Sequence, residues 1–361
     1  MGLTVTVSVS DPEPSVADAL GAPPGRDRAT VAAAVRAALA LPAVAAVRPP
    51  GAGRTARRWH LLRTLARWDV AVGRLVEAHL DATAILAELG GAPAAGPARA
   101  DQVWAVWAAE PPDGPVVARQ DADGWTLTGR KPWCSAAAFA TDALVTARAG
   151  DDRRLFAVDV AAARAAGRAR TSPGGWAAAG MAQTSTWPLD LDGVPATPVG
   201  GVRGYLDRPG FWHGAAGVAA CWLGGADAVL APLVARAVSG RLDPHGLAHL
   251  GAADAAVHAA AALLDTVAAR VDADPLDAAG TAQVDARRVR AAVEHAATTA
   301  LDRTGRALGA APLCLDAGHA RAVEDLTVYL RQSHAERDLE ALGTLVGKGA
   351  ARDAGPVGGG R

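Results

Sequence analysis

The chain has 361 residues, half of them hydrophobic, and a formal net charge of −1 at pH 7. That length buries large cores in a multi-domain unit. The near-neutral charge argues against a nucleic-acid surface, and no uninterrupted apolar run is long enough to span a bilayer. Cys134, Cys221 and Cys314 are far apart and odd in number, which is typical of a reducing compartment. We expect a cytoplasmic protein that binds neither nucleic acid nor a membrane.

The first hundred residues are predicted to be helical. An alanine-rich helix is expected over 29–47, and apolar residues recur at helical spacing in a second helix over 58–89. The stretch 91–100 is rich in glycine, proline and alanine. Such composition between two periodic segments is typical of a domain boundary.

Residues 101–202 carry a strand pattern instead. Short apolar segments such as 103–107 and 155–158 are separated by turn signals, and apolar and polar residues alternate over 125–128. Several short strands at this spacing predict a small β-domain, either a barrel or a sandwich.

From residue 203 to the end the pattern is helical again. Gly and Pro clusters separate four long segments, and four long antiparallel helices form a bundle. The predicted fold class is therefore α+β, mainly α, with domains at 1–100, 101–202 and 203–361. The four helices are expected over 209–239, 245–271, 281–308 and 317–344.

Trp133 and Ser135 lie two apart at the end of a predicted strand, so on an extended segment they share a face. A flat aromatic ring beside a hydroxyl suits a flat ligand with polar edges, such as a flavin. A core tryptophan beside a surface serine is the alternative interpretation, and these residues alone favour it. Cys134 points to the opposite face and is interpreted as a core residue.

The segment from Asp123 to Ala136, DGWTLTGRKPWCSA, resembles the middle-domain signature of the acyl-CoA dehydrogenase family. The run 180–195 resembles the last strands of that domain, and the order of helices, β-domain and helical bundle is also that of the family. The resemblance implies an oxidoreductase that binds FAD. It places Trp133 against the isoalloxazine ring and the Ser135 hydroxyl on flavin N5.

The same resemblance implies further cofactor contacts. It assigns flavin-edge contacts to the run that includes Trp107 and Ala109. It assigns Arg236 and Gly309 to a flavin site completed by a neighbouring subunit, and so implies a homodimer or homotetramer. The family's threonine falls on Ala109 and its phosphate-binding serine on Pro115, so both hydroxyls are missing. Main-chain N–H groups near Ala109 can still serve a flavin, whereas Pro115 has none.

The catalytic base departs from the family pattern. The usual glutamate falls on Ser333, which cannot act as the base that removes an α-proton from an acyl thioester. A minority of the family places the glutamate before an arginine at the start of the first bundle helix, where this chain has Asp207-Arg208. Two interpretations of Asp207 stay open. It is the base, with Arg208 shaping the site, or it is a helix N-cap ahead of Pro209.

Three functions are compatible with this resemblance. The main expectation is FAD-dependent α,β-oxidation of an acyl thioester, with a displaced or missing base. The alternative is a flavin-dependent monooxygenase on the same fold, because such relatives lack the glutamate. A degenerate, non-catalytic member is the third. No metal site is expected, since His245 and His249 share a helix face without an evident third ligand.

Overall fold

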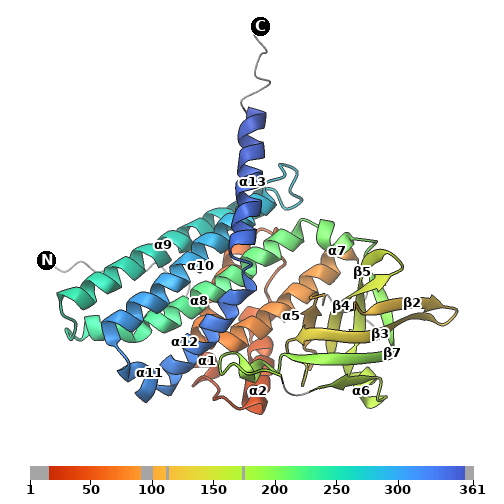
Figure 1. Ribbon diagram of the computed structural model, residues 1–361, viewed down its shortest axis with the longest axis horizontal. Coiled ribbons are helices and arrows are strands. Elements are labelled where there is room, and N and C mark those ends of the chain that lie inside the picture. The colour runs from red at the N-terminus through yellow and green to blue at the C-terminus, as the bar shows by residue number, and fades with distance from the viewer. Residues whose placement is uncertain (1–15, 91–100, 111–113, 173–174, 354–361) are drawn as a thin grey trace, which may run out of the picture.

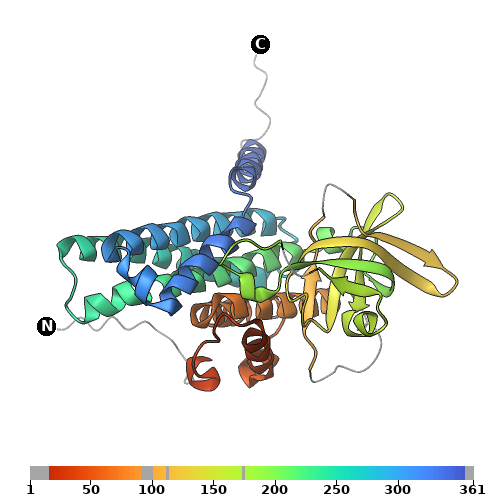
Figure 2. The ribbon, with the colours of Figure 1, turned by 60° about the horizontal axis from the view of Figure 1, so that its bottom comes forward.

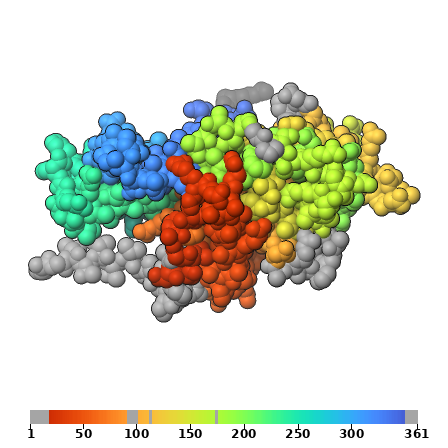
Figure 3. Space-filling model, turned by 90° about the horizontal axis from the view of Figure 1, so that it is seen from below, coloured from red at the N-terminus to blue at the C-terminus, as the bar shows by residue number. Residues whose placement is uncertain are grey.

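The structure, a computed structural model, describes residues 16–90, 101–110, 114–172 and 175–353. Helices occupy the described chain before residue 90 and after residue 203, and all strands of the described residues lie between these two regions. The helices form one side of the molecule and the strands the other (Figures 1 and 2). Seen from below, the N-terminal helices lie across the boundary between these two sides (Figure 3).

The N-terminal helices are more numerous than expected. The helix expected over 29–47 is two helices, because Pro42 begins a new one. The helix expected over 58–89 is interrupted at Asp69, which is extended and accepts a hydrogen bond from the Val72 N–H at 2.9 Å as the N-cap of the next helix. The bounds are α1 (Val16–Leu20), α2 (Arg28–Ala40), α3 (Pro42–Ala45), α4 (Thr55–Trp68) and α5 (Val70–Leu89).

The strands close into a five-stranded barrel, one of the two expected β architectures. Strand β4 pairs with β2 in parallel, and the pairs β2–β3, β3–β7, β7–β5 and β5–β4 are antiparallel. Strand β1 pairs with β4 and β6 pairs with β7 outside this ring. The bounds are β1 (Trp104–Trp107), β2 (Val117–Asp121), β3 (Gly124–Cys134), β4 (Asp142–Ala149), β5 (Asp152–Asp159), α6 (Val160–Ala165), β6 (Ala169–Thr171), η1 (Ala182–Thr184) and β7 (Trp187–Val199).

Helix α8 (Gly210–Val238) is the central helix of the helical side, and α4, α9 and α10 pack against it. Trp222 of this helix is fully buried. Helix α4 comes so close that a Cβ on Gly224 would lie 2.1 Å from the Arg63 carbonyl oxygen, so this position requires glycine. The bounds of the neighbouring helices are α7 (Gly204–Asp207), α9 (Pro244–Ala273) and α10 (Ala282–Leu308).

The fourth bundle helix, expected over 317–344, is wrong as a single element. The chain leaves the helix at Ser333, which is extended, and Ala335 has a left-handed φ of 46°. The final helix points away from the bundle (Figure 1). The bounds are α11 (Ala311–Leu315), α12 (Ala317–Tyr329), η2 (Leu330–Gln332) and α13 (Glu336–Asp353).

Two helices, α8 and α9, are long and apolar enough to cross a membrane by length and composition alone. The apolar window of α8 is 61% buried within the protein, as expected of a core helix, and that of α9 is 22% buried. The expectation of no membrane contact stays a prediction.

Candidate functional site

A cavity of about 910 Å³ lies where the barrel meets α5, α8, α10 and the end of α12. One wall comes from the barrel side and carries Trp133, Ser135 and Trp176. The other walls are helical and carry several arginines and carboxylates. Its volume is in the upper part of the range of sites that enclose a small molecule or cofactor.

On the barrel wall, Trp133 is the most conspicuous side chain, with 65% of it exposed. Its φ of 57° is left-handed, and the pairing of β3 with β7 shifts register between Lys131 and Cys134. Trp133 and Ser135 both line the cavity, but a bulge brings them there instead of the regular extended segment that was expected. The Trp176 ring meets Trp133 edge-on, with centroids 6.0 Å apart.

Ser135 is held from two sides. The indole N–H of Trp107 donates to the Ser135 carbonyl oxygen at 2.9 Å, and the Thr186 hydroxyl donates to Ser135 Oγ at 3.1 Å. Ser135 Oγ therefore keeps its own hydrogen for an acceptor in the cavity. Trp107 itself is buried and does not line the cavity, so the structure places it behind Ser135 and not against a ligand.

Ala109 lines the cavity together with Ala108, just after the end of β1. This is where a main-chain contact to a flavin edge was expected. Cys134 is fully buried, as expected of a core residue, and burial raises the pKa of its thiol well above its usual range. A thiol with a raised pKa is a poor nucleophile.

Helix α5 contributes a buried charged face that the sequence analysis did not predict. Arg74 donates to Glu77 at 2.5 Å, and Asp81 lies one turn further along the helix. Burial raises the pKa of Glu77 to about 7, against the opposing effect of Arg74, and burial also raises the pKa of Asp81. The signal in the sequence was the i, i+3, i+7 spacing of three charges on one face of a mainly apolar helix.

The structure separates the adjacent residues Asp207 and Arg208. Arg208 lines the cavity, its side chain is 4% exposed, and it pairs with Glu88 at 2.6 Å. Asp207 does not line the cavity, and its side chain, 56% exposed, pairs with Arg203. The N-cap interpretation of Asp207 is wrong, because α8 begins after Pro209, and the Gly210 N–H donates to Glu88 instead. The geometry gives no support to Asp207 as a base.

Ser333 lies next to the cavity but not in its lining. Its hydroxyl donates to Glu294 at 2.6 Å, whereas the flanking residues Gln332 and His334 do line the cavity. Arg236 is in the last turn of α8, and Gly309 follows the end of α10. Both helices end on the side away from the barrel (Figure 1), so neither residue lies in this chain's own cavity.

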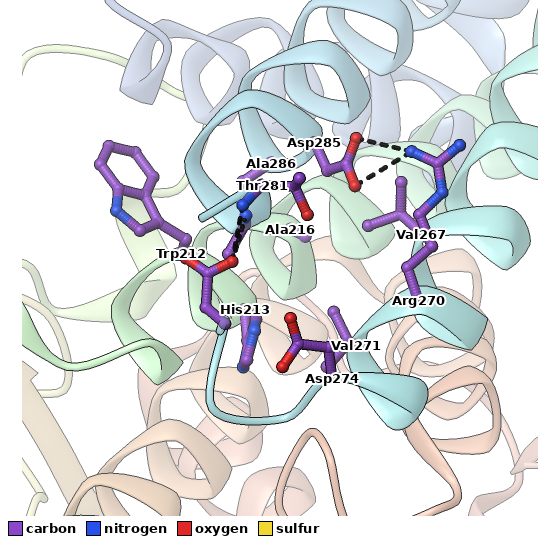
Figure 4. Close-up of a pocket in the computed structure, with 12 residues that line it drawn as sticks. Trp212, His213, Ala216, Val267, Arg270, Val271, Asp274, Thr281, Asp285 and Ala286 are labelled. Atoms are coloured by element: carbon purple, nitrogen blue, oxygen red, sulfur yellow. Dashed lines mark hydrogen bonds and ion pairs between the residues drawn. The ribbon is translucent and has the colours of Figure 1, made fainter. Parts of the chain in front are cut away.

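A second cavity lies between the start of α8 and the end of α9, where His213 and Asp274 face each other (Figure 4). Its volume is about 20 Å³, which is room for about one water molecule. Arg270 pairs with Asp285 at 2.9 Å on its border. This small cavity is a packing feature and not a ligand site.

Among the residues that the structure describes, no group of three or more histidine, cysteine or acidic side chains could hold a metal ion. His245 and His249 therefore have no third ligand within the described ranges. The large cavity is the site in which the chemistry of this protein is best sought.

No protein-family model matches the chain, and no curated protein matches it. Solved structures do. Dibenzothiophene monooxygenase TdsC from Paenibacillus sp. A11-2 has a TM-score of 0.70 and 19% identity, covering 89% of this chain and 90% of its own. TdsC has also been solved with FMN and indole. Methanesulfinate monooxygenase MsuC from Pseudomonas fluorescens has a TM-score of 0.64 and 18% identity, over 89% of this chain and 90% of its own.

Nitrososynthase from Micromonospora carbonacea var. africana is similar as well, with a TM-score of 0.65 and 20% identity over 81% of this chain and 82% of its own. At these identities the similarity establishes the fold. The expected mainly helical α+β architecture is confirmed as the acyl-CoA dehydrogenase fold, in the broad sense that includes these proteins.

Proposed function

We propose that this protein is a flavin-dependent monooxygenase that oxidises a small molecule within the 910 Å³ cavity. The observation that carries the proposal is the barrel wall. An exposed tryptophan ring and a serine hydroxyl with an available hydrogen line the cavity. Of the two base positions of the dehydrogenase pattern, one carries Ser333 and the other carries Asp207, which does not line the cavity.

The residues present fit a flavin. Trp133 and Trp176 offer aromatic surface to a flat ring, and Ser135 offers a hydroxyl hydrogen to a ring nitrogen. Ala109 brings main-chain groups to the same wall. The loss of a hydroxyl and an N–H at Pro115 reduces the contacts available to a cofactor phosphate, which favours a flavin that exchanges with solution. The cofactor is FMN or FAD, and TdsC, on the same fold, has been solved with FMN.

When bound, reduced flavin supplies the electrons that activate dioxygen for insertion of one oxygen atom into a substrate. The balance requires two electrons and two protons, because the second oxygen atom leaves as water. Glu77 has a pKa of about 7, so it can hold or release a proton at working pH inside the cavity. Val106, Phe211 and Val328 give the cavity apolar surface that excludes water from the reacting atoms.

A specific observation favours a second candidate function, thioester oxidation. Glu77 is a buried carboxyl with a raised pKa, as a base for an α-proton requires. It would take over the role expected of Asp207, although it stands on α5 and is already paired with Arg74.

The proposed assembly is a homodimer or homotetramer in a cytoplasmic setting. Arg236 and Gly309 lie at helix ends remote from the barrel (Figure 1), so they can serve a flavin only in a neighbouring copy. Light scattering tests this assembly. A monomer that still binds flavin with full affinity would remove these two residues from the site.

The test of function begins with titration of oxidised and reduced FMN and FAD into the purified protein. We expect Ser135→Ala to weaken flavin binding about tenfold, the cost of roughly one good hydrogen bond. Ser172→Ala is the matched control, because that serine bonds Asp190 and does not line the cavity. Incorporation of ¹⁸O from dioxygen into an indole probe would support the monooxygenase.

The other outcomes separate the candidates. Anaerobic bleaching of bound flavin by an acyl-CoA, abolished by Glu77→Gln, would support thioester oxidation instead. Failure to bind either flavin in either redox state would sink both enzymatic functions and leave a non-catalytic member of the fold.

A further inference from the structure

We propose that the α10 side of the cavity is an anion subsite, in which Arg290 pairs with a phosphate, carboxylate or sulfonate group of the bound small molecule. This inference rests on the proposed function, because it assumes that the large cavity is the ligand site. It adds to that function the charge of the ligand and the residue that recognises this charge.

Arg290 differs from the other arginines of the cavity in its partners. Its guanidinium donates to the carbonyl oxygens of Ala215 and Gln332, each at 3.2 Å. It stacks on the ring of Trp222, with 4.5 Å from Cζ to the ring centroid. All three partners are neutral, and within the described residues Arg290 forms no ion pair.

Each of the other cavity arginines has a carboxylate. Arg74 pairs with Glu77 at 2.5 Å, Arg208 with Glu88 at 2.6 Å, Arg287 with Asp338 at 2.8 Å and Arg331 with Glu294 at 3.7 Å. The cavity lining carries five arginines and three carboxylates, and Glu88 and Glu294, outside the lining, pair with Arg208 and Arg331. Arg290 is therefore the cavity arginine without a paired carboxylate among the described residues.

Against the larger effect of burial, Asp338 and Glu294 raise the pKa of Arg290 from a distance, but neither forms an ion pair with it among the described residues. Asp338 is bonded to Arg287 and accepts from the His334 N–H, while Glu294 accepts from Ser333. Burial lowers the pKa of Arg290, although a guanidinium remains protonated at any working pH. Arg290 is half-buried, and a partly buried charge without a paired carboxylate is costly. Carbonyl and ring contacts offset only part of that cost. An anionic group of the ligand would offset the remaining cost.

The surroundings suit a planar or tetrahedral anion. Arg287 lies one turn before Arg290 and stacks on Trp212, and within the described chain its Nε has no hydrogen-bond partner. Arg331 also lines the cavity, its side chain is 61% exposed, and its ion pair with Glu294 is long, at 3.7 Å. Guanidinium groups recognise carboxylate and phosphate through paired N–H donors. Arg287 and Arg290 of α10 and Arg331 of η2 all line the cavity.

Two matched ligand pairs distinguish the sources of the anion. FMN and riboflavin differ only in the phosphate, and indole-3-carboxylate and indole differ only in the acid. Dissociation constants are measured by calorimetry for the wild type, Arg290→Gln and Arg290→Lys. Arg288→Gln is the control, because Arg288 is exposed on the same helix and outside the cavity lining.

In the wild type we expect the anionic member of one pair to bind at least about tenfold tighter than its neutral partner. Arg290→Gln should abolish that preference, Arg290→Lys should keep part of it, and Arg288→Gln should leave it unchanged. A preference within the flavin pair assigns the anion to the cofactor phosphate, and one within the indole pair assigns it to an acidic substrate.

No preference in either pair, or a preference that survives Arg290→Gln, would overturn the subsite. If Arg290→Gln does not fold, a competition experiment on the wild type still tests the subsite. Inorganic phosphate should weaken the binding of the anionic probe and leave the binding of the neutral probe unchanged. The proposed function fails separately, by absence of flavin binding. Equal binding of FMN and riboflavin, with no preference within the indole pair, would leave that function standing and reject only the subsite.

Discussion

The Trp107 indole N–H donates a hydrogen bond to the main-chain carbonyl of Ser135 at 2.9 Å. The bond ties the end of β1 to the residue that follows β3, and so fixes where the Ser135 hydroxyl stands in the cavity. Trp107 thus acts on the site through Ser135, as a positioning residue.

Replacing Trp107 tests its role in positioning Ser135. Trp107→Phe keeps a buried aromatic ring but leaves a carbonyl oxygen without its partner, which should destabilise the protein by about 1–3 kcal/mol in urea unfolding. Flavin affinity should fall several-fold, because Ser135 loses its support. Trp68→Phe is the matched control, since its N–H bonds the Gly21 carbonyl in an exposed setting. Unchanged flavin affinity in Trp107→Phe would rule out the positioning role.

Trp133 should show a conflict between stability and binding. Its left-handed φ of 57° is strained for a residue with a side chain, and most of that side chain is exposed. Trp133→Gly should therefore be about 1 kcal/mol more stable than Trp133→Ala, because glycine adopts this conformation freely. Both variants should bind flavin much more weakly than the wild type. Equal stability of the two variants would mean that the backbone carries no such strain.

The stability of the protein should depend on Glu77 between pH 4.5 and pH 7. Burial raises the pKa of Glu77 in the folded state to about 7, so the folded protein binds more protons than the unfolded chain in this range. Stability should therefore fall as pH rises through it, by about 3 kcal/mol at most. Asp69, with a folded pKa of about 6, contributes the same sign over a lower range.

Urea unfolding of the wild type and Glu77→Gln at intervals from pH 5 to pH 8 separates the two groups. Above pH 6 the slope should come mainly from Glu77 and should flatten in Glu77→Gln. A slope that persists unchanged in this variant would assign the titration to another carboxyl of the cavity, with Asp81 the first to replace.

Lys131 should produce the opposite dependence at alkaline pH. It is 1% exposed, and its ammonium donates to the Thr146 carbonyl at 2.7 Å and hydroxyl at 2.8 Å. Burial lowers the pKa of Lys131 to about 8, so between pH 8 and pH 10.5 the unfolded chain binds more protons. Stability should rise with pH across that window, by about 3 kcal/mol at most. Lys131→Met should remove the rise, whereas Arg130→Met, at an exposed position of the same strand, should not.

Trp133 and Ser135, which the resemblance assigned to a flavin site, both line the cavity, whereas their local pattern alone favoured a core tryptophan beside a surface serine. Trp133 and Ser135 were identified from their spacing and their resemblance to a known signature, because strand alternation and turn residues act over a few positions. The same local reasoning placed the strands of the β-domain and three of the four bundle helices. It missed the break at Ser333, where a hydroxyl bonds Glu294 from a different helix.

By itself, the sequence determined the type of each segment, since helical and strand periodicity depend on neighbours a few residues apart. Only the tertiary structure decided which charges are buried and which of them line the cavity. Asp207 turned to Arg203 and not to the cavity, Glu77 was buried beside Arg74, and Arg290 was left with neutral partners. The first two pairs lie within one helical turn, so what the tertiary structure set was their exposure, and for Arg290 its contacts with distant residues. The free energy of a charge depends on the groups that fold around it.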